Sequence, residues 1–264
     1  MYYTGATYSL LFDFSPNSLP EEQLPDYGHA ADAVLTKYYN LLFSEMALNS
    51  LPNTKREALN ASGYFVCPAI MPYPFTVLCD PNKEIQDFVS ALQRHYSSAH
   101  LRTMVVSWAS TLGWKDRVDL FLETIDNIDD YRFRSAIAML IPQLEGTLRD
   151  GIHILYQNDS RMNPQAALAF LSKKMEEKDL PNITKAYLSS LSEYFSGTSG
   201  LFVSFKNWTD DLSSSFISRH AVSHGKNVPE MYTRANCVRL FLILSTIHDI
   251  CSALSGNECS ILPK

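Results

Sequence analysis

The sequence contains few cysteines, and none of them belongs to a recognisable motif. Five cysteines occur among 264 residues, with no Cys-x-x-Cys pair and no histidine partner at zinc-finger spacing. An odd number of scattered cysteines argues against a disulfide framework and against a zinc-finger domain. We therefore expect reduced thiols in a cytoplasmic protein.

Positive charge is also scarce. The chain has 22 lysines and arginines against 28 aspartates and glutamates, for a formal net charge of −6. Proteins that coat long nucleic acids through their whole surface usually carry an excess of basic residues. The composition argues against such a role and leaves room only for a local contact with nucleic acid.

The sequence also lacks a glycine-rich phosphate loop, which argues against nucleotide hydrolysis of the P-loop kind. Its most apolar stretch, residues 240–250, includes His248 and Asp249 and is too short and too polar to cross a membrane. The first five residues contain no basic residue of the kind that opens a secretory signal. We therefore expect no association with membranes.

Apolar residues at helical spacing are what the sequence does have. They make up 46% of the chain, against 19% charged residues, which suffices for a buried core. Nothing after Gly113 alternates like a strand, so we expect an all-α fold. Helices are expected at about 30–49, 84–112 with breaks, 114–128, 137–155, 164–177, 183–195, 208–222 and 234–254.

Gly113 is the expected boundary between two regions. Residues 1–112 would form a mainly helical N-terminal region of unknown role, and residues 113–264 a helical bundle. Within the first region, four prolines among residues 64–81 exclude a long helix and predict extended or irregular chain. This proline-rich, aromatic stretch is the only basis for a further hypothesis, that the first region recognises a partner and regulates the second region.

The segment that could carry chemistry is Ser218-Arg219-His220-Ala221-Val222-Ser223-His224-Gly225. On an unbroken helix, residues five apart are rotated by about 140°, so Arg219 and His224 would not converge. Gly225 favours a helix end, and Pro229 favours the start of a new segment. If the helix ends before His224, the chain can turn back and bring the two side chains together.

An arginine and a histidine placed in this way suit phosphate chemistry. The planar guanidinium holds two phosphate oxygens, and imidazole accepts or donates a proton near neutrality. Together they could cleave RNA without a metal ion, because the attacking group would be the ribose 2′-hydroxyl. As a bare pattern, the same residues also fit solvated helix-end side chains or a capping pair.

Two blocks of sequence resemble the HEPN family. Arg219-His220-x-x-x-His224-Gly225 is similar to the RNase motif of HEPN domains, and it precedes the apolar helix expected at 234–254, as in that family. Upstream, Pro142-Gln143-x-Glu145-Gly146-x-x-Arg149 is similar to a segment of uncharacterised bacterial HEPN-like proteins. The resemblance covers about residues 115–255.

The resemblance implies a HEPN-like helical bundle that dimerises and places two Arg–His pairs around one RNA-binding cleft. It implies a metal-independent endoribonuclease without cofactors, acting in bacterial defence or as the toxin of a toxin–antitoxin pair. Arg219 and His224 would be catalytic, and an antitoxin or regulatory protein is a possible partner. Some relatives have lost activity, so a non-catalytic module for dimerisation, nucleotide binding or protein binding remains the alternative.

Several neighbours could support this site. His220 could orient the phosphate or be a solvated side chain. Glu145 could form an ion pair with Arg149 one turn away, or it could orient Arg219 or a histidine across the bundle. Lys226, Arg234 and Arg239 could bind substrate phosphates. Residues 211–240 hold these three and Arg219 against Asp211 and Glu230, so four positive minus two negative charges leave a local charge of +2.

A metal site is not expected. His220 and His224 have the i, i+4 spacing of two zinc ligands on a helix, but Ala221 occupies the place of the glutamate that a zincin requires. His153 and His248 lie in or beside apolar helical faces, and we expect both to be packing residues.

Overall fold

The structure of the protein is a computed structural model. It describes residues 2–4, 7–9, 51–70, 73–111, 113–158, 162–178, 180, 182–196, 201, 217–226 and 228–255. The chain divides into two compact units, residues 1–37 and 38–264. In the first unit, strands β1 (Tyr2–Thr4) and β2 (Thr7–Ser9) pair in an antiparallel register that places Tyr3 opposite Tyr8.

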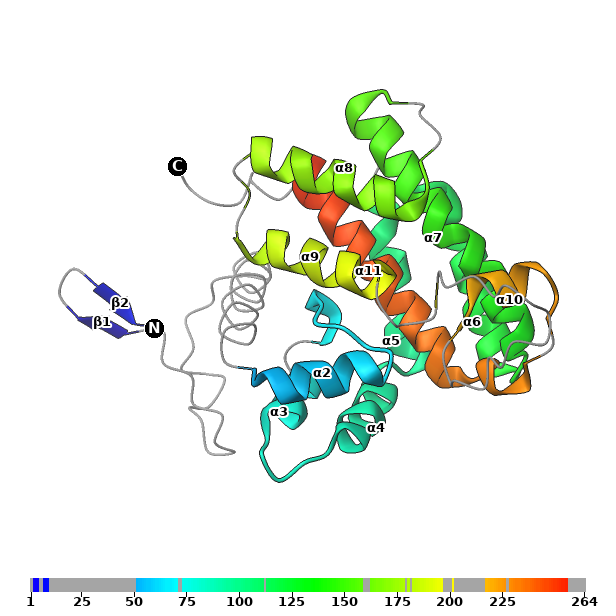
Figure 1. Cartoon of the computed structure of the whole chain (residues 1–264), viewed down its shortest axis with the longest axis horizontal. Helices are drawn as coiled ribbons and strands as arrows, with labels where there is room; N and C mark the ends of the chain where they lie inside the picture. Colours follow the sequence, from blue (N-terminus) through cyan, green and yellow to red (C-terminus); the bar gives the residue numbers. More distant parts are fainter. Residues whose placement is uncertain are drawn as a thin grey trace, which may run out of the picture. The chain divides into compact units, whose positions relative to one another are not determined.

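Helices are the only secondary structure among the described residues of the second unit, which confirms the all-α prediction for this unit (Figure 1). Its α-helices are α2 (Asn53–Ala61), α3 (Tyr73–Cys79), α4 (Ile85–His95), α5 (Ser98–Ser107), α6 (Val118–Asp129), α7 (Phe133–Tyr156), α8 (Pro164–Glu177), α9 (Asn182–Ser196), α10 (Arg219–Ser223) and α11 (Arg234–Ser255). Short 3₁₀ helices are η2 (Pro68–Ile70), η3 (Trp108–Ser110), η4 (Lys115–Arg117) and η5 (Pro229–Met231).

Helix α11 is the centre of the core. Every residue from Asn236 to Ile247 is buried, as expected of a helix that is covered on all sides. It packs along α7 and α9, and Figure 1 shows it running between them. The apolar stretch 240–250 was expected to be too short and too polar to cross a membrane, but the whole 22-residue helix would suit a membrane span by length and composition alone. However, 83% of its most apolar window is buried inside the protein. Packing within the fold therefore accounts for the hydropathy of α11.

Helices α7 and α11 approach each other closely at Gly151. A Cβ atom at this position would lie 2.6 Å from the Sγ atom of Cys251, well inside van der Waals contact. Tyr131 lies just after the C-terminal end of α6 and adopts a left-handed φ of +58°, a conformation that usually selects glycine at this position. Its N–H donates to the Ile128 carbonyl, and the next N–H, of Arg132, donates to the Asn127 carbonyl.

The structure corrects one local expectation and leaves others untested. Residues 64–81 were expected to contain no long helix and to be extended or irregular. No long helix occurs among their described residues, but the short helix α3 forms there, with Pro74 in its first turn, where proline is tolerated. The helix expected at 30–49 and most of that expected at 208–222 lie outside the described residues.

The expected boundary at Gly113 does not coincide with the division of the chain after residue 37. Trp108 and Trp114 lie on either side of Gly113. Their rings meet edge to face, 5.1 Å apart between centroids, inside one core.

Candidate functional site

Residues 218–223 form the capped start and the body of α10. The hydroxyl of Ser218 accepts a hydrogen bond from the Ala221 N–H at 3.2 Å and so caps the first turn. The Arg219 N–H donates to the Leu201 carbonyl at 2.8 Å. Because α10 also packs against α7, its side chains are held at a defined place on the surface of that helix.

The end of α10 follows the sequence prediction. The helix ends at Ser223, His224 is its C-cap, and Gly225 adopts a left-handed φ of +70°. The N–H of Lys226 then donates back to the Ala221 carbonyl at 2.8 Å, as in a Schellman motif. The chain therefore reverses after the histidine, whose own N–H still donates to the His220 carbonyl at 3.0 Å. His224 thus keeps its helical place one turn from His220, and the turn does not bring its side chain back to Arg219.

Glu145 on α7 faces arginines from two helices. Its Oε1 atom forms an ion pair with Nε of Arg219 on α10, and its Oε2 atom lies 3.5 Å from Nη2 of Arg149, one turn along α7. The Glu145 side chain is only 15% exposed, and Oε1 is buried without a hydrogen bond of good geometry. The charge of Arg219 therefore compensates for its burial. The two contacts suggested as alternatives by the sequence occur together.

Arg219 is attached to Glu145 through its inner nitrogen. Nε is the atom at the carboxylate, and no contact from the described residues occupies the terminal nitrogens Nη1 and Nη2. The side chain as a whole is 32% exposed. The edge formed by the terminal nitrogens is the part of a guanidinium that holds two oxygens of one phosphate.

His220 and His224 lie side by side on α10. Their rings are nearly parallel, with an interplanar angle of 6° and 6.2 Å between centroids. Burial lowers the pKa of His220 below its usual range, and the neighbouring charges of Arg219 and His224 lower it further, while Glu145 opposes them. These influences together favour the neutral form of the His220 imidazole.

Arg234 contacts another helix instead of remaining open to a substrate. Its two terminal nitrogens donate to the carbonyls of Gln93 at 3.0 Å and Tyr96 at 2.6 Å, at the C-terminal end of α4. These carbonyls have no partner within α4, and a positive charge is favourable at this end of a helix. Arg234 therefore caps α4, which argues against its expected role as a phosphate ligand.

Arg239 is buried, with 8% of its surface exposed. It donates to the Ser62 carbonyl at 2.7 Å and to the side chain of Asn236, and its guanidinium carbon lies 4.4 Å from the ring centroid of Tyr64. These contacts join α11 to the chain after α2. We do not retain Arg239 as a substrate-binding residue, whereas Lys226 stays at the half-exposed turn after Gly225.

Sequence reasoning missed Arg117. Its guanidinium donates to Gln143 and pairs with Asp150, both on α7, and lies across Gly146 between them. A Cβ atom on Gly146 would lie 3.0 Å from the Arg117 Nη2 atom, so glycine allows this close approach. The signal was a glycine in the middle of a long amphipathic helix.

The two other histidines that the sequence singled out differ from each other. His248 is a packing residue, as expected: its ring stacks on Trp108 at 5.7 Å between centroids, and its Nε2 atom is 2.8 Å from the Thr111 hydroxyl. His153 was expected to pack as well, but its side chain is exposed on α7. The apolar positions of α7 turn away from solvent, and residue 153 falls outside their stripe.

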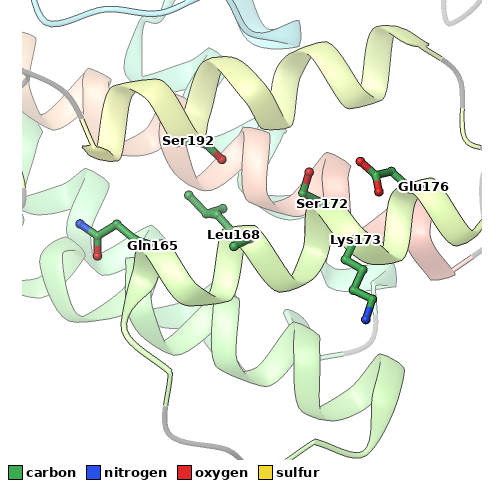
Figure 2. A pocket seen from close by; sticks show the side chains of 7 residues that line it. Gln165, Leu168, Ser172, Lys173, Glu176 and Ser192 are labelled. Carbon is green, nitrogen blue, oxygen red and sulfur yellow. The ribbon is translucent and has the colours of Figure 1, made fainter.

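A separate groove runs between α8 and α9 (Figure 2). Its volume is about 490 Å³, and its lining includes Leu168 and the polar residues Lys173, Glu176 and Ser192. None of the residues that the sequence singled out lines this groove. Its mixed polar lining selects no particular ligand.

The cysteines in the described part of the chain are free thiols. Cys67, Cys237 and Cys251 are buried, and burial raises the pKa of each thiol to about 12. A thiol with such a pKa is unreactive near neutrality, because the thiolate is the reactive form. Among the described residues, no three histidine, cysteine or acidic side chains are grouped in a way that could hold a metal ion.

Comparisons with protein-family models, with curated proteins and with solved structures found no match to this chain.

Proposed function

We propose that α10 and the facing surface of α7 form the active site of a metal-independent endoribonuclease of the HEPN type. The observation that carries this proposal is the placement of Arg219, whose Nε atom pairs with the half-buried carboxylate of Glu145. Its terminal edge thereby faces away from the carboxylate and can receive a phosphate. The resemblance of the two sequence blocks supports the same site.

The chemistry requires a ribose. The 2′-oxygen attacks the phosphorus atom and loses its proton, the bond to the 5′-oxygen breaks, and that oxygen gains a proton. The products are a 2′,3′-cyclic phosphate and a 5′-hydroxyl. Arg219 stabilises the charge that develops on the phosphate oxygens, and His224 moves the proton. DNA lacks the attacking hydroxyl and is not a substrate.

The biological setting is proposed from the resemblance alone. We propose a cytoplasmic homodimer in which two such sites face one RNA-binding cleft. It would act in bacterial defence or toxin–antitoxin growth arrest, under the control of an antitoxin or regulatory protein. The N-terminal region could supply the contact with that protein.

One observation favours a second candidate, a non-catalytic module for dimerisation or for binding a nucleotide or a protein. The ion pair between Arg219 and Glu145 joins α10 to α7, and an ion pair with a purely structural role would have the same geometry. Under this alternative, replacing Arg219 lowers the melting temperature and changes no catalytic rate.

Arg219→Ala separates the two candidates. On labelled RNA with EDTA present, we expect the variant to cleave at least about a hundredfold more slowly than wild type, because one charge-stabilising contact is lost. Arg132→Ala is the matched control: Arg132 is an exposed arginine at the start of α7, paired with Asp130 at 2.6 Å. Full activity in Arg219→Ala would contradict the proposal.

A further inference from the structure

We infer that Arg149 is a second phosphate ligand, and that the site therefore takes RNA with a phosphate next to the scissile one. This inference rests on the proposed function, because it names the part of the substrate that the site reads. It concerns binding of the neighbouring phosphate, while Arg219 serves the reacting one.

The two arginines are positioned by one carboxylate. Arg219 approaches Oε1 of Glu145 from α10, and Arg149 approaches Oε2 from the next turn of α7. Both guanidinium groups therefore lie against the same carboxylate, one at each of its oxygens. The arrangement therefore presents two phosphate-binding groups side by side.

Exposure increases outward from the carboxylate. The Glu145 side chain is 15% exposed, that of Arg219 32%, and that of Arg149 53%. The contact between Arg149 and Glu145 is also long, at 3.5 Å. An exposed i, i+4 pair of this kind contributes little to stability. Arg149 can therefore exchange Glu145 for a phosphate with little loss of stability.

The charges around Arg149 leave a positive excess for an anion. Glu145 carries one negative charge and faces two guanidinium groups, so this group of three side chains has a net charge of +1. Asp150 follows Arg149 in the chain, but its carboxylate pairs with Arg117. Among the described residues, Glu145 is the carboxylate paired with Arg149.

The test compares two substrate pools of random sequence. Dinucleoside monophosphates contain only the scissile phosphate, whereas trinucleoside diphosphates also contain a neighbouring one. For wild type we expect kcat/KM to be about tenfold higher on the longer pool, the effect of one charge-assisted hydrogen bond. In Arg149→Ala this preference should disappear through a raised KM with unchanged kcat, and Arg149→Lys should restore part of it.

Binding provides a readout that does not depend on cleavage. For 2′-O-methyl RNA, which cannot react, we expect the salt dependence of the affinity to fall by about one phosphate contact in Arg149→Ala. Arg132→Ala should match wild type in both assays. An Arg149→Ala protein that keeps both the substrate preference and the salt dependence overturns this inference alone. A wild-type protein that neither cleaves nor binds RNA overturns the proposed function together with it.

Discussion

Different sides of helix α7 make different kinds of contact. One face packs on α11 through apolar side chains, so closely that Gly151 has no room for a Cβ atom beside Cys251. Beside this apolar face, one flank of α7 carries Glu145 and Arg149, and Glu145 pairs with Arg219 of α10. The opposite flank carries Gln143 and Asp150, which contact Arg117.

We expect the apolar face to stabilise the fold and the charged flank beside α10 to serve the proposed activity. Apolar burial is the main favourable term in folding, whereas ion pairs of this exposure contribute little and a buried pair can be replaced by apolar residues at no loss. A fold that needed only stability would not require a half-buried carboxylate with two arginines. We therefore expect changes on the α11 face to alter stability and changes on the α10 face to alter activity.

Among changes on α7, the largest effect is expected from Glu145→Gln, which keeps the shape of the side chain and removes its charge. Arg219 loses the group that holds its Nε atom, and we expect kcat to fall by about a hundredfold. The free energy of unfolding should fall by less than about 1 kcal/mol, because both arginines are partly exposed.

The same variant has a spectroscopic signature. Glu145 raises the pKa of His220 against the other influences, so its neutralisation should lower that pKa further. Titration of His220 by NMR measures the shift, and activity that survives in Glu145→Gln would contradict the assigned positioning role.

Gly151→Ala tests the other face. The added Cβ meets the Cys251 Sγ atom, and we expect a loss of about 1–3 kcal/mol in the free energy of unfolding, measured with urea. Adding Cys251→Ala removes the sulfur and leaves only the Cβ of residue 251, 3.8 Å away. The double variant should therefore be less destabilised than the sum of the two single ones, and simple additivity would argue against this packing.

The smallest effect concerns pH. His95 and His100, at the junction of α4 and α5, lie 4.5 Å apart between ring centroids. Burial lowers the pKa of both below 6.5, and the charge of His100 lowers that of His95 further. The unfolded chain then binds protons more readily, so stability is full above pH 6.5 and falls as the pH drops through the lowered pKa values.

Replacing both of these histidines by glutamine should reduce this loss of stability in acid. The pH profile of RNA cleavage should stay unchanged, because the pair lies outside the proposed site. A change in the pH profile of cleavage would contradict the expectation that the histidine pair acts independently of the proposed site.

Local patterns predicted much of the fold and of α10. Apolar spacing and Pro164 placed α8 at its observed bounds, and the glycine at 225 predicted the helix end before His224. Such features depend on neighbours within a few residues, which the sequence displays directly.

Contacts between distant segments were not predictable in the same way. Arg234 caps a helix end 138 residues away at Tyr96, and Arg239 reaches Ser62 across 177 residues. A local excess of positive charge cannot distinguish such arginines from those that face solvent. The charge of +2 around α10 therefore overestimated the number of phosphate ligands.

The most direct test of the central claim compares wild type with His224→Ala on labelled RNA in the presence of EDTA, with analysis of the new ends. We expect cleavage by the wild type alone, leaving a 2′,3′-cyclic phosphate and a 5′-hydroxyl, while both proteins melt at the same temperature. Equal cleavage by both proteins, or loss of wild-type cleavage on chelation, would contradict a metal-independent nuclease centred on His224.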